Sequence, residues 1–394
     1  MNILYINNDM SISGSPKAIL TELKLLKQLG HNTFVISSGG PLVSELEKEG
    51  ISHFHVDLPL LGDTGIPTEN KLPWDIKWRY LKASIKKNRL ISSVYNIKKI
   101  IKKNDIDIIQ LHQPGPTFAG AIAAILTGTP YIIRIQHILK NEFPPLFHST
   151  IVRKAKGISV ITPEIYNHLQ EVFEIDPQFI RIIPTAVNLG GREPFKEKRN
   201  MLKILSVTTF GDVKYQAVIK LIKAVNLLLE KGIDCELNII GDGPKKELIL
   251  ETISKMNPSY REKVKLLGAI SNIEDYYINT DIVVGVGRVA MEALYFGKPL
   301  LCCSHFSYGG IFTKDNSEKI YSYNFSGRNF GKDSLKEECI FNDLLKLSLA
   351  NNHTFELMYK YNTDFFDKRF NSNKLSLRTE ELFNSARYTP KGKI

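Results

Sequence analysis

Residues 284–302, VGVGRVAMEALYFGKPLLC, hold the residue types that bind phosphate and ribose. Gly285 and Gly287 let the backbone approach a ligand closely, and the helix that follows begins with free N–H groups and a positive dipole end. Glu292 comes one helical turn after Arg288, so both side chains project from the same side near the helix start. The pattern predicts a seat for a diphosphate, with the carboxylate accepting hydrogen bonds from ribose hydroxyls. A tight turn followed by an ordinary surface ion pair is the alternative.

Two histidines follow predicted strands. His112 comes directly after the apolar run at 106–111, and His137 follows the run YIIRIQ. Open α/β sheets bind ligands at the carboxyl ends of their strands, so both histidines are candidates for a ligand site. For each of them, packing of a lone histidine into a loop is the alternative.

Two short clusters have the residue types of metal sites. Asp105 and Asp107 have acid-x-acid spacing, but they introduce an apolar strand and do not end one. In Cys302-Cys303-Ser304-His305, neighbouring strand residues point to opposite faces, and no further ligand has suitable spacing. We therefore expect a core strand here and no metal site.

Short apolar runs alternate with segments of helical period through the first half of the chain. Leu20, Leu23 and Leu26 recur at helical steps, which gives the first helix one apolar face. The order strand, helix, strand is typical of a parallel sheet covered by helices on both faces. Strands are predicted at 3–6, 33–36, 106–111, 131–135, 158–161 and 179–183.

The polar stretch GGREPFKEKRN, at 190–200, is predicted to link this half to a second one. The second half repeats the same order, with a helix that ends at Gly232 and strands expected at 202–207, 235–240, 264–267, 281–284 and 300–303. In the turn GDGP we expect Gly241 and Pro244 to shape a sharp strand-to-helix connection. The fold class is therefore α/β, with two Rossmann-like halves.

Bulk composition fits a packed protein of two domains. The chain has 394 residues, of which 43% are hydrophobic and 24% charged, close to the averages of globular proteins. The four cysteines have neither the paired spacing nor the density of a disulfide scaffold. No run of ~18 apolar residues and no leader peptide is recognisable. We therefore expect a cytoplasmic protein.

Much of the formal net charge of +11 lies between Lys71 and Lys103, where Asp75 is the single acid. Trp74 and Trp78, the chain's two tryptophans, lie in the same segment. Indole rings among unopposed cations suit an anionic membrane surface, while a solvated helix face is the alternative. The same field attracts phosphate-bearing acceptors, and we expect nucleic acid not to be the partner.

GVGRVAMEALYFGKPLL resembles the donor-binding signature of glycosyltransferase family 4, in which a loop precedes a Glu and an alanine-rich helix that ends in Gly-x-Pro. MNILYINN with Gly14-Ser15, and then LGHNTFVIS, resembles that family's first strand, glycine loop and second strand. DIIQLHQPGP, IPTAVN and ILSVTTFGDVKYQAVIKLIKA resemble further segments of the family in the expected order. The resemblance extends over nearly the whole chain. It implies a GT-B fold, in which two facing Rossmann-like domains with parallel sheets border an interdomain cleft.

The resemblance also implies a reaction and a division of roles. Residues 1–190, completed by a C-terminal helix at 373–388, are expected to form the acceptor domain, and residues 201–370 the donor domain. The expected reaction transfers a sugar, with retention, from a nucleoside diphosphate to an unidentified acceptor such as a cell-surface glycan or a lipid-linked precursor. UDP is expected rather than GDP. Neither a cofactor nor a metal is implied, because cations and a helix N-terminus neutralise the leaving diphosphate.

Residue by residue, the resemblance assigns Lys214 to the diphosphate and Glu292 to the ribose. Thr209 stands where the family has an arginine, and we infer that Arg288 supplies the missing charge. Val284 stands where the family has a second Glu near the transferred sugar, which bears on the sugar held and on whether transfer occurs. The expected site has His112 and Arg288 as catalytic residues, His137 on the acceptor side, and Gly14, Ser15, Lys214, Gly285, Val286, Gly287, Arg288 and Glu292 around the donor.

Two other classes of function fit the same residues. A degenerate nucleotide-sugar-binding protein without transfer activity would explain the uncharged Thr209 and Val284. An isomerase or hydrolase on the same fold would use the nucleotide sugar with water. Release of nucleoside diphosphate, measured with and without an acceptor, separates these two classes from a transferase.

Overall fold

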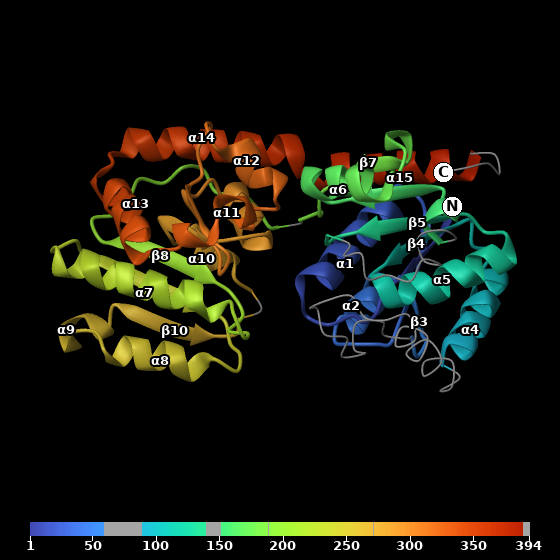
Figure 1. Ribbon diagram of the computed structural model, residues 1–394, viewed down its shortest axis with the longest axis horizontal. Coiled ribbons are helices and arrows are strands. Elements are labelled where there is room, and N and C mark those ends of the chain that lie inside the picture. Colours follow the sequence, from blue (N-terminus) through green and yellow to red (C-terminus); the bar gives the residue numbers. More distant parts are fainter. Residues whose placement is uncertain (59–88, 139–150, 188, 271, 389–394) are drawn as a thin grey trace. The chain divides into compact units, whose positions relative to one another are not determined.

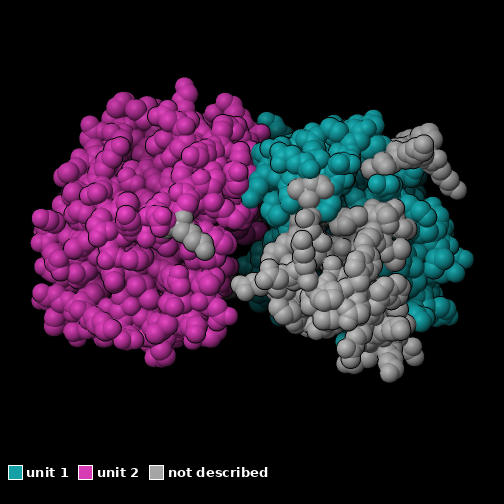
Figure 2. Space-filling model, in the orientation of Figure 1, with its two compact units in different colours: residues 1–186, 372–394 teal, residues 187–371 magenta. Residues whose placement is uncertain are grey.

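The computed structural model describes residues 1–58, 89–138, 151–187, 189–270 and 272–388. The chain forms two compact units, one comprising residues 1–186 and 372–394 and the other residues 187–371 (Figure 2). Each unit contains a sheet with helices on both of its faces (Figure 1). The predicted α/β class, with two Rossmann-like halves, is confirmed.

The first unit has a parallel sheet with the order β3-β2-β1-β4-β5-β6-β7 over its described residues. Its strands are β1 (Asn2–Ile6), β2 (Asn32–Ser37), β3 (Ser52–His55), β4 (Ile108–His112), β5 (Tyr131–Ile135), β6 (Gly157–Val160) and β7 (Ile180–Ile182). The apolar pattern misses β3, because its sequence SHFH is short and polar, as edge strands often are.

Helices cover both faces of this sheet. α4 (Arg89–Lys103), α5 (Pro114–Thr127) and α6 (Pro163–Phe173) pack on the face that includes Ile109 and Leu111. α1 (Gly14–Gln28) and α15 (Ser372–Tyr388) pack on the opposite face, which includes Ile108, and α2 (Val43–Lys48) follows β2. A side-chain hydrogen bond joins α15 to α1, in which Thr379 Oγ1 donates to Glu22 Oε1 at 2.9 Å. The end of the chain therefore completes the core of the first unit.

The second unit has a sheet with the order β10-β9-β8-β11-β12-β13 over its described residues. The strands are β8 (Leu202–Val207), β9 (Cys235–Ile240), β10 (Val264–Gly268), β11 (Ile282–Gly285), β12 (Leu300–Cys303) and β13 (Tyr308–Ile311). β13 is an antiparallel edge strand paired with β12, and the others are parallel. The apolar pattern misses β13, because its two glycines leave no alternation to recognise.

Two groups of helices enclose the second sheet, as the left part of Figure 1 shows. α7 (Tyr215–Glu230), α8 (Lys246–Ser254) and α13 (Glu337–Leu349) share a core with Ile204 and Ile282. α10 (Glu274–Ile278), α11 (Arg288–Tyr295), α12 (Ser317–Ser322) and α14 (Asn352–Arg369) share a core with Leu205 and Val283 on the other face, and α9 (Pro258–Arg261) follows α8. Alternate strand residues therefore supply the two cores.

The loops that follow β8 and β9 are joined through their backbones. Phe210 N donates to the carbonyl of Asp242 at 2.9 Å, and Lys245 N donates to the carbonyl of Phe210 at 3.1 Å. Gly241 has a φ of +155°, and a Cβ added to it would lie 1.8 Å from the carbonyl oxygen of Thr208. Only glycine fits there, so the GDGP turn fixes the loop that leads into α7.

Candidate functional site

The order of strands in the second unit reverses between β8 and β11. The chain runs from β8 through α7 to β9 on one side, and from β11 through α11 to β12 on the other. α7 and α11 therefore both begin at the carboxyl edge of the sheet, beside the reversal. Open parallel sheets bind ligands at such a point, and the first turn of each helix offers N–H groups without helical partners.

Lys214 and Arg288 lie at these two helix starts. Lys214 is exposed and directly precedes α7, and Arg288 is the first residue of α11, with 24% of its side chain exposed. Gly287 precedes Arg288 with a φ of 57° and a ψ of −125°, a conformation that residues with a Cβ rarely adopt. Both cations therefore border the same edge of the sheet.

Glu292 is buried one turn into α11 and has two donors. Its Oε1 accepts from Nε of Arg288 at 2.8 Å, and its Oε2 accepts from the hydroxyl of Tyr277 at 2.8 Å. Burial, followed by the Glu292 carboxylate, raises the pKa of Tyr277 well above its usual range, so the phenol remains a donor. The carboxylate is thus held in one orientation from two sides.

Arg288 has a donor left over. Its Nη1 is buried and has no hydrogen-bond partner among the residues that the structure describes. A guanidinium N–H beside a helix N-terminus suits an oxyanion in charge and geometry. The pair with Glu292 therefore differs from an ordinary surface ion pair, because its carboxylate is buried and Nη1 of its guanidinium is buried without a partner among the described residues.

The other predicted donor residues surround this group. A Cβ on Gly285 would lie 2.4 Å from Cγ1 of Val289, so glycine lets α11 begin close against β11. Val286 is half-buried in the same loop. Of the two departures from the family pattern, Thr209 is exposed in the loop after β8, whereas Val284 packs in the core.

Two residues that interact with this group were missed by sequence reasoning. Tyr277 comes from α10, and no spacing rule connects it to Glu292. His305 follows β12 and was considered only as a metal ligand; burial, and then the Lys214 ammonium, lowers its pKa. The sequence could have indicated His305, because it follows a predicted strand at the carboxyl edge of the sheet. His305 and Lys214 therefore lie close enough to interact electrostatically.

In the first unit, the order of strands reverses between β1 and β4, and the predicted residues lie at that edge. Gly14 and Ser15 begin α1, where Ser15 Oγ donates to Gln136 Oε1 at 2.9 Å. His112 ends β4 and is buried, with 1% exposed. Gln113 follows with a φ of 64°, a strained conformation of the kind that clusters at functional sites. His137, two residues beyond β5, is exposed.

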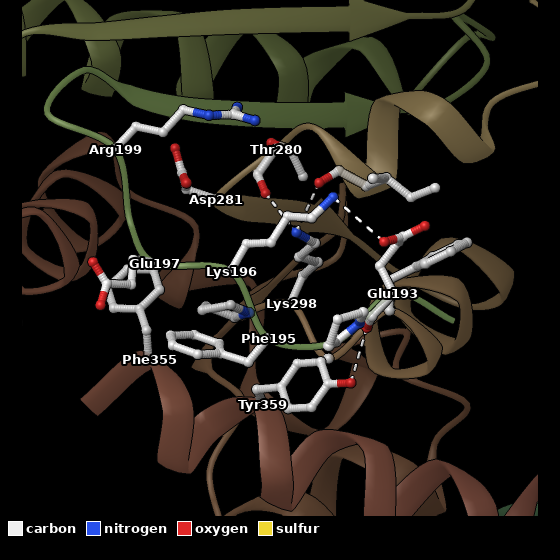
Figure 3. A pocket seen from close by; sticks show the side chains of 15 residues that line it. Glu193, Phe195, Lys196, Glu197, Arg199, Thr280, Asp281, Lys298, Phe355 and Tyr359 are labelled. Atoms are coloured by element: carbon white, nitrogen blue, oxygen red, sulfur yellow. Dashed lines mark hydrogen bonds and ion pairs between the residues drawn. The ribbon is translucent and has the colours of Figure 1, made fainter. Parts of the chain in front are cut away.

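Figure 3 shows a cavity of about 140 Å³ at another place in the second unit. Asp281 in its lining directly precedes β11, and Lys298 precedes β12, so the cavity lies at the amino edge of the sheet. Lys298 Nζ donates to the carbonyls of Ile278 at 3.1 Å and Thr280 at 2.9 Å. Burial lowers the pKa of Lys298 to about 8. This lysine caps the end of α10, and the cavity is separate from the edge with Lys214 and Arg288.

Of the two clusters considered for metal binding, the acidic one has other partners and the cysteines lie in a core strand. Asp107 Oδ2 accepts from Asn2 N at 2.8 Å and its Oδ1 from Arg387 at 2.9 Å. Cys302 and Cys303 are buried in β12. In the described part of the chain, no group of three or more acidic, histidine or cysteine side chains is placed to hold a metal ion.

The basic segment is described only in part. Trp74 and Trp78, with the residues from Lys71 to Asn88, lie outside the described residues. The remainder forms α4, where Ile91 and Tyr95 are exposed, as are Lys99, Lys102 and Lys103. Among the described residues, none of the helices combines the length and the apolar character that crossing a lipid bilayer requires.

Comparison of the sequence with known families gives two adjacent matches. Residues 12–190 match Glycosyltransferase Family 4, and residues 192–321 match Glycosyl transferases group 1. Protein CapJ of Staphylococcus aureus is 25% identical over 264 residues, which are 61% of this chain and 64% of CapJ. The chain therefore spans less than two thirds of the length of CapJ.

Comparison of the fold gives matches over nearly the whole chain. A glycosyltransferase from Rickettsia africae has a TM-score of 0.72 at 19% identity, covering 98% of this chain and 99% of that one. HepE of Anabaena, in complex with UDP and glucose, has a TM-score of 0.65 at 15% identity, covering 98% and 100%. With the two family matches and the two Rossmann-like units in agreement, the chain is a family 4-like glycosyltransferase with the GT-B fold.

Proposed function

We propose that the chain transfers a sugar from a UDP-sugar to an acceptor, with retention of configuration at the anomeric carbon. The observation that carries the proposal is the buried Glu292 of α11, which is held by the buried Tyr277 of α10 and by the half-buried Arg288. Its carboxylate suits ribose hydroxyls, and its cation, together with Lys214 and two helix N-termini, suits a diphosphate. The complex of HepE with UDP and glucose supports UDP as the nucleotide.

In the proposed reaction, the bond between the anomeric carbon and the diphosphate oxygen breaks as the bond to the acceptor oxygen forms on the same face. The departing diphosphate takes the proton of the acceptor hydroxyl. Lys214 and Arg288 stabilise the negative charge that develops on the diphosphate, and His112 contacts the sugar. Because these cations neutralise the leaving group, we propose that transfer of a hexose needs no metal ion.

The first unit holds the acceptor in this proposal. Residues 1–190, together with the C-terminal helix at 373–388, form the acceptor domain, with His137 in the acceptor pocket and Gly14 and Ser15 reaching the donor. Residues 201–370 form the donor domain. The acceptor is a cell-surface glycan or a lipid-linked precursor, and the enzyme reaches it at a membrane surface.

UDP release from a panel of UDP- and GDP-sugars, with and without candidate acceptors and with a chelator, tests the activity. Release that requires an acceptor and persists with the chelator supports a metal-independent transferase. Release without any acceptor would instead indicate a hydrolase. Binding without release would indicate a nucleotide-sugar-binding protein.

Glu292→Gln should weaken the binding of free UDP by about 1.5 kcal/mol, roughly tenfold, because ribose loses an ionised acceptor. Tyr277→Phe keeps the carboxylate but removes one of the two donors that orient it, so we expect a smaller loss of about 1 kcal/mol. Calorimetric titration with UDP measures both. Tyr276→Phe, the same change at the preceding residue of α10, is the matched control. Unchanged UDP affinity in Glu292→Gln would give Glu292 a purely structural role.

We propose that α4 brings the enzyme to an anionic lipid surface. Ile91 and Tyr95 are 62% and 65% exposed and lie one helical turn apart, and Lys99 and Lys102 continue the exposed side. α4 contains no acidic residue, so nothing on the helix itself opposes these cations. Exposed apolar side chains next to lysines suit the headgroup region of an anionic bilayer.

Vesicle co-sedimentation should show binding to anionic lipid at low salt and little binding to neutral lipid. The double variant Lys99→Gln with Lys102→Gln should bind several-fold less, since each cation near the surface contributes about 1 kcal/mol. Lys231→Gln with Lys336→Gln, two exposed lysines of the second unit, removes the same charge elsewhere and should bind like the parent. If the parent ignores anionic vesicles at low salt, the membrane proposal fails.

A further inference from the structure

A buried polar layer lies under the carboxyl edge of the first sheet. Strand alternation places Tyr5, Gln110 and His112 on the face that α1 and α15 cover, and Arg134 is the partner of His112 on the neighbouring strand. None of these four side chains is more than 4% exposed. Buried polar groups need hydrogen-bond partners, so the few contacts that these groups make determine which of their atoms carry protons.

Gln110 determines which ring nitrogen of His112 can carry a proton. The amide nitrogen Nε2 of Gln110 lies 3.0 Å from Nε2 of His112. With the amide in this orientation its NH₂ donates and the imidazole Nε2 accepts, so the proton of the neutral ring lies on Nδ1, while Oε1 of Gln110 has no partner among the described residues. Tyr5 stacks on the ring at 5.2 Å between centroids and 30° between planes, which fixes the plane in which Nδ1 points.

Arg134 acts on the charge of the same ring. Burial, followed by the Arg134 guanidinium, lowers the pKa of His112 well below its usual range. Arg134 stays in place because its Nη2 donates to the carbonyl of Ile183 at 3.1 Å. It forms no ion pair with any of the described carboxylates that would cancel its field.

The negative charge in this layer, on Glu22, acts on Tyr5 and not on His112. Glu22 of α1 is held by Thr379 of α15, and burial and then Glu22 raise the pKa of Tyr5 well above its usual range. Tyr5 therefore remains an uncharged phenol between Glu22 and the imidazole. Around His112 itself, Arg134 is the charged group that acts on the ring.

The remaining ring nitrogen has no assigned contact. Nδ1 of His112 is buried and has no hydrogen-bond partner within the described ranges. The ring ends β4 beside the strand reversal, and the strained Gln113 follows directly. A neutral N–H at this position can donate to a sugar oxygen without adding a charge to the site.

We propose that Gln110 and Arg134 are positioning residues that hold His112 as the neutral tautomer with its proton on Nδ1, so that the ring presents an N–H donor to an oxygen of the donor sugar. This inference rests on the proposed function, in which His112 contacts that sugar. It goes further by giving the protonation state of the ring and the two residues that set it.

The imidazole ¹⁵N–¹H spectrum of the full chain tests the tautomer without any activity assay. His112→Gln identifies the signal among those of the nine histidines. We expect the parent signal to be that of a neutral ring protonated on Nδ1, unchanged from about pH 5.5 to pH 8, although a free imidazole titrates near pH 6.5. Gln110→Glu should move the proton to Nε2, because a carboxylate accepts where the amide donates. Gln178→Glu, an exposed control, should leave the signal unchanged.

Transfer kinetics give the second readout. Gln110→Glu and the apolar Gln110→Leu should lower kcat about tenfold or more with little change in UDP affinity, because the ring loses its orientation toward the sugar. Arg134→Gln should raise the pKa of His112, so activity should begin to fall at a higher pH as the solution is acidified. Arg181→Gln, on β7 two strands away from Arg134, removes an exposed cation and should keep the parent profile.

A parent signal from a ring protonated on Nε2, or one that titrates near pH 6.5, overturns the inference even if the variants are unstable, since it is read on the parent. The predicted tautomer together with unaltered transfer by Gln110→Glu would have a different meaning. It would leave the assignment of the proton standing and remove His112 from the reaction, which is a failure of the proposed function.

Discussion

Replacing Arg288 by alanine should remove most of the affinity for the donor diphosphate. The loss of a charge-assisted hydrogen bond corresponds to about 1.5–3 kcal/mol, or roughly 10- to 150-fold in the dissociation constant of UDP. Arg288→Lys should recover only part of it, because the ammonium lacks the guanidinium fork that bonds Glu292 and leaves Nη1 available. Calorimetric titration with UDP and with uridine separates contacts to phosphate from contacts to the nucleoside.

Lys214→Ala should weaken UDP binding by a similar amount, since Lys214 stands at the start of α7 on the same edge. Lys231→Ala, at the other end of the same helix, provides a matched control and should bind UDP like the parent. Uridine affinity should change little in Lys214→Ala and Lys231→Ala, whereas Arg288→Ala should lower it by about 1 kcal/mol, because Glu292 loses one of the two donors that orient it. If Arg288→Ala and Lys214→Ala both bind UDP as the parent does, the diphosphate lies elsewhere.

Gly241→Ala should produce the largest loss of stability among single substitutions near the site. The added Cβ would meet the carbonyl oxygen of Thr208 at 1.8 Å, and φ of +155° disfavours any side chain, so the two joined loops must separate. Overpacking and backbone strain together suggest a loss of about 3–5 kcal/mol in the free energy of unfolding. Chemical denaturation of parent and variant measures it.

Gly232→Ala is the control for the cost of a positive φ without a steric clash. Gly232 also has a positive φ, of +77°, but an added Cβ would meet no atom within 4 Å. We expect a cost of about 1 kcal/mol there. Equal losses in the two variants would show that the contact between the loops after β8 and β9 contributes nothing beyond backbone strain.

The sequence predicted the elements whose residues repeat a regular pattern. β4, β5, β8 and β9 are rich in apolar residues because the faces of a central parallel strand are covered by helices, so they are visible in the sequence. β3 and β13 lie at sheet edges, where polar residues and glycines are tolerated, and the pattern therefore misses them.

The candidate site was predictable where it depended on position within one element. The start of α11, with Gly287, Arg288 and Glu292, follows from local spacing alone. The burial of that pair does not, because it depends on Tyr277, which reaches Glu292 from another helix. Sequence reasoning therefore left open whether the pair was an ordinary surface ion pair.

The polar layer around His112 was likewise predictable only in part. Gln110 shares a face with His112 by strand alternation and could have been found from spacing. Arg134 becomes its neighbour only through the register of β4 with β5. Pairing between strands is a property of the folded sheet, so no local pattern in the chain contains it.

Hydrogen exchange of the parent protein with and without UDP tests the central claim most directly. At about 100 times its dissociation constant, UDP should slow the exchange of the amides it contacts by about 100-fold, which corresponds to 2.7 kcal/mol. We predict that this protection falls on the first turns of α7 and α11 and on the loops before them, at 208–216 and 285–291. Protection confined to the cavity of Figure 3, at 193–199 and 296–299, or no protection at all, would contradict the account.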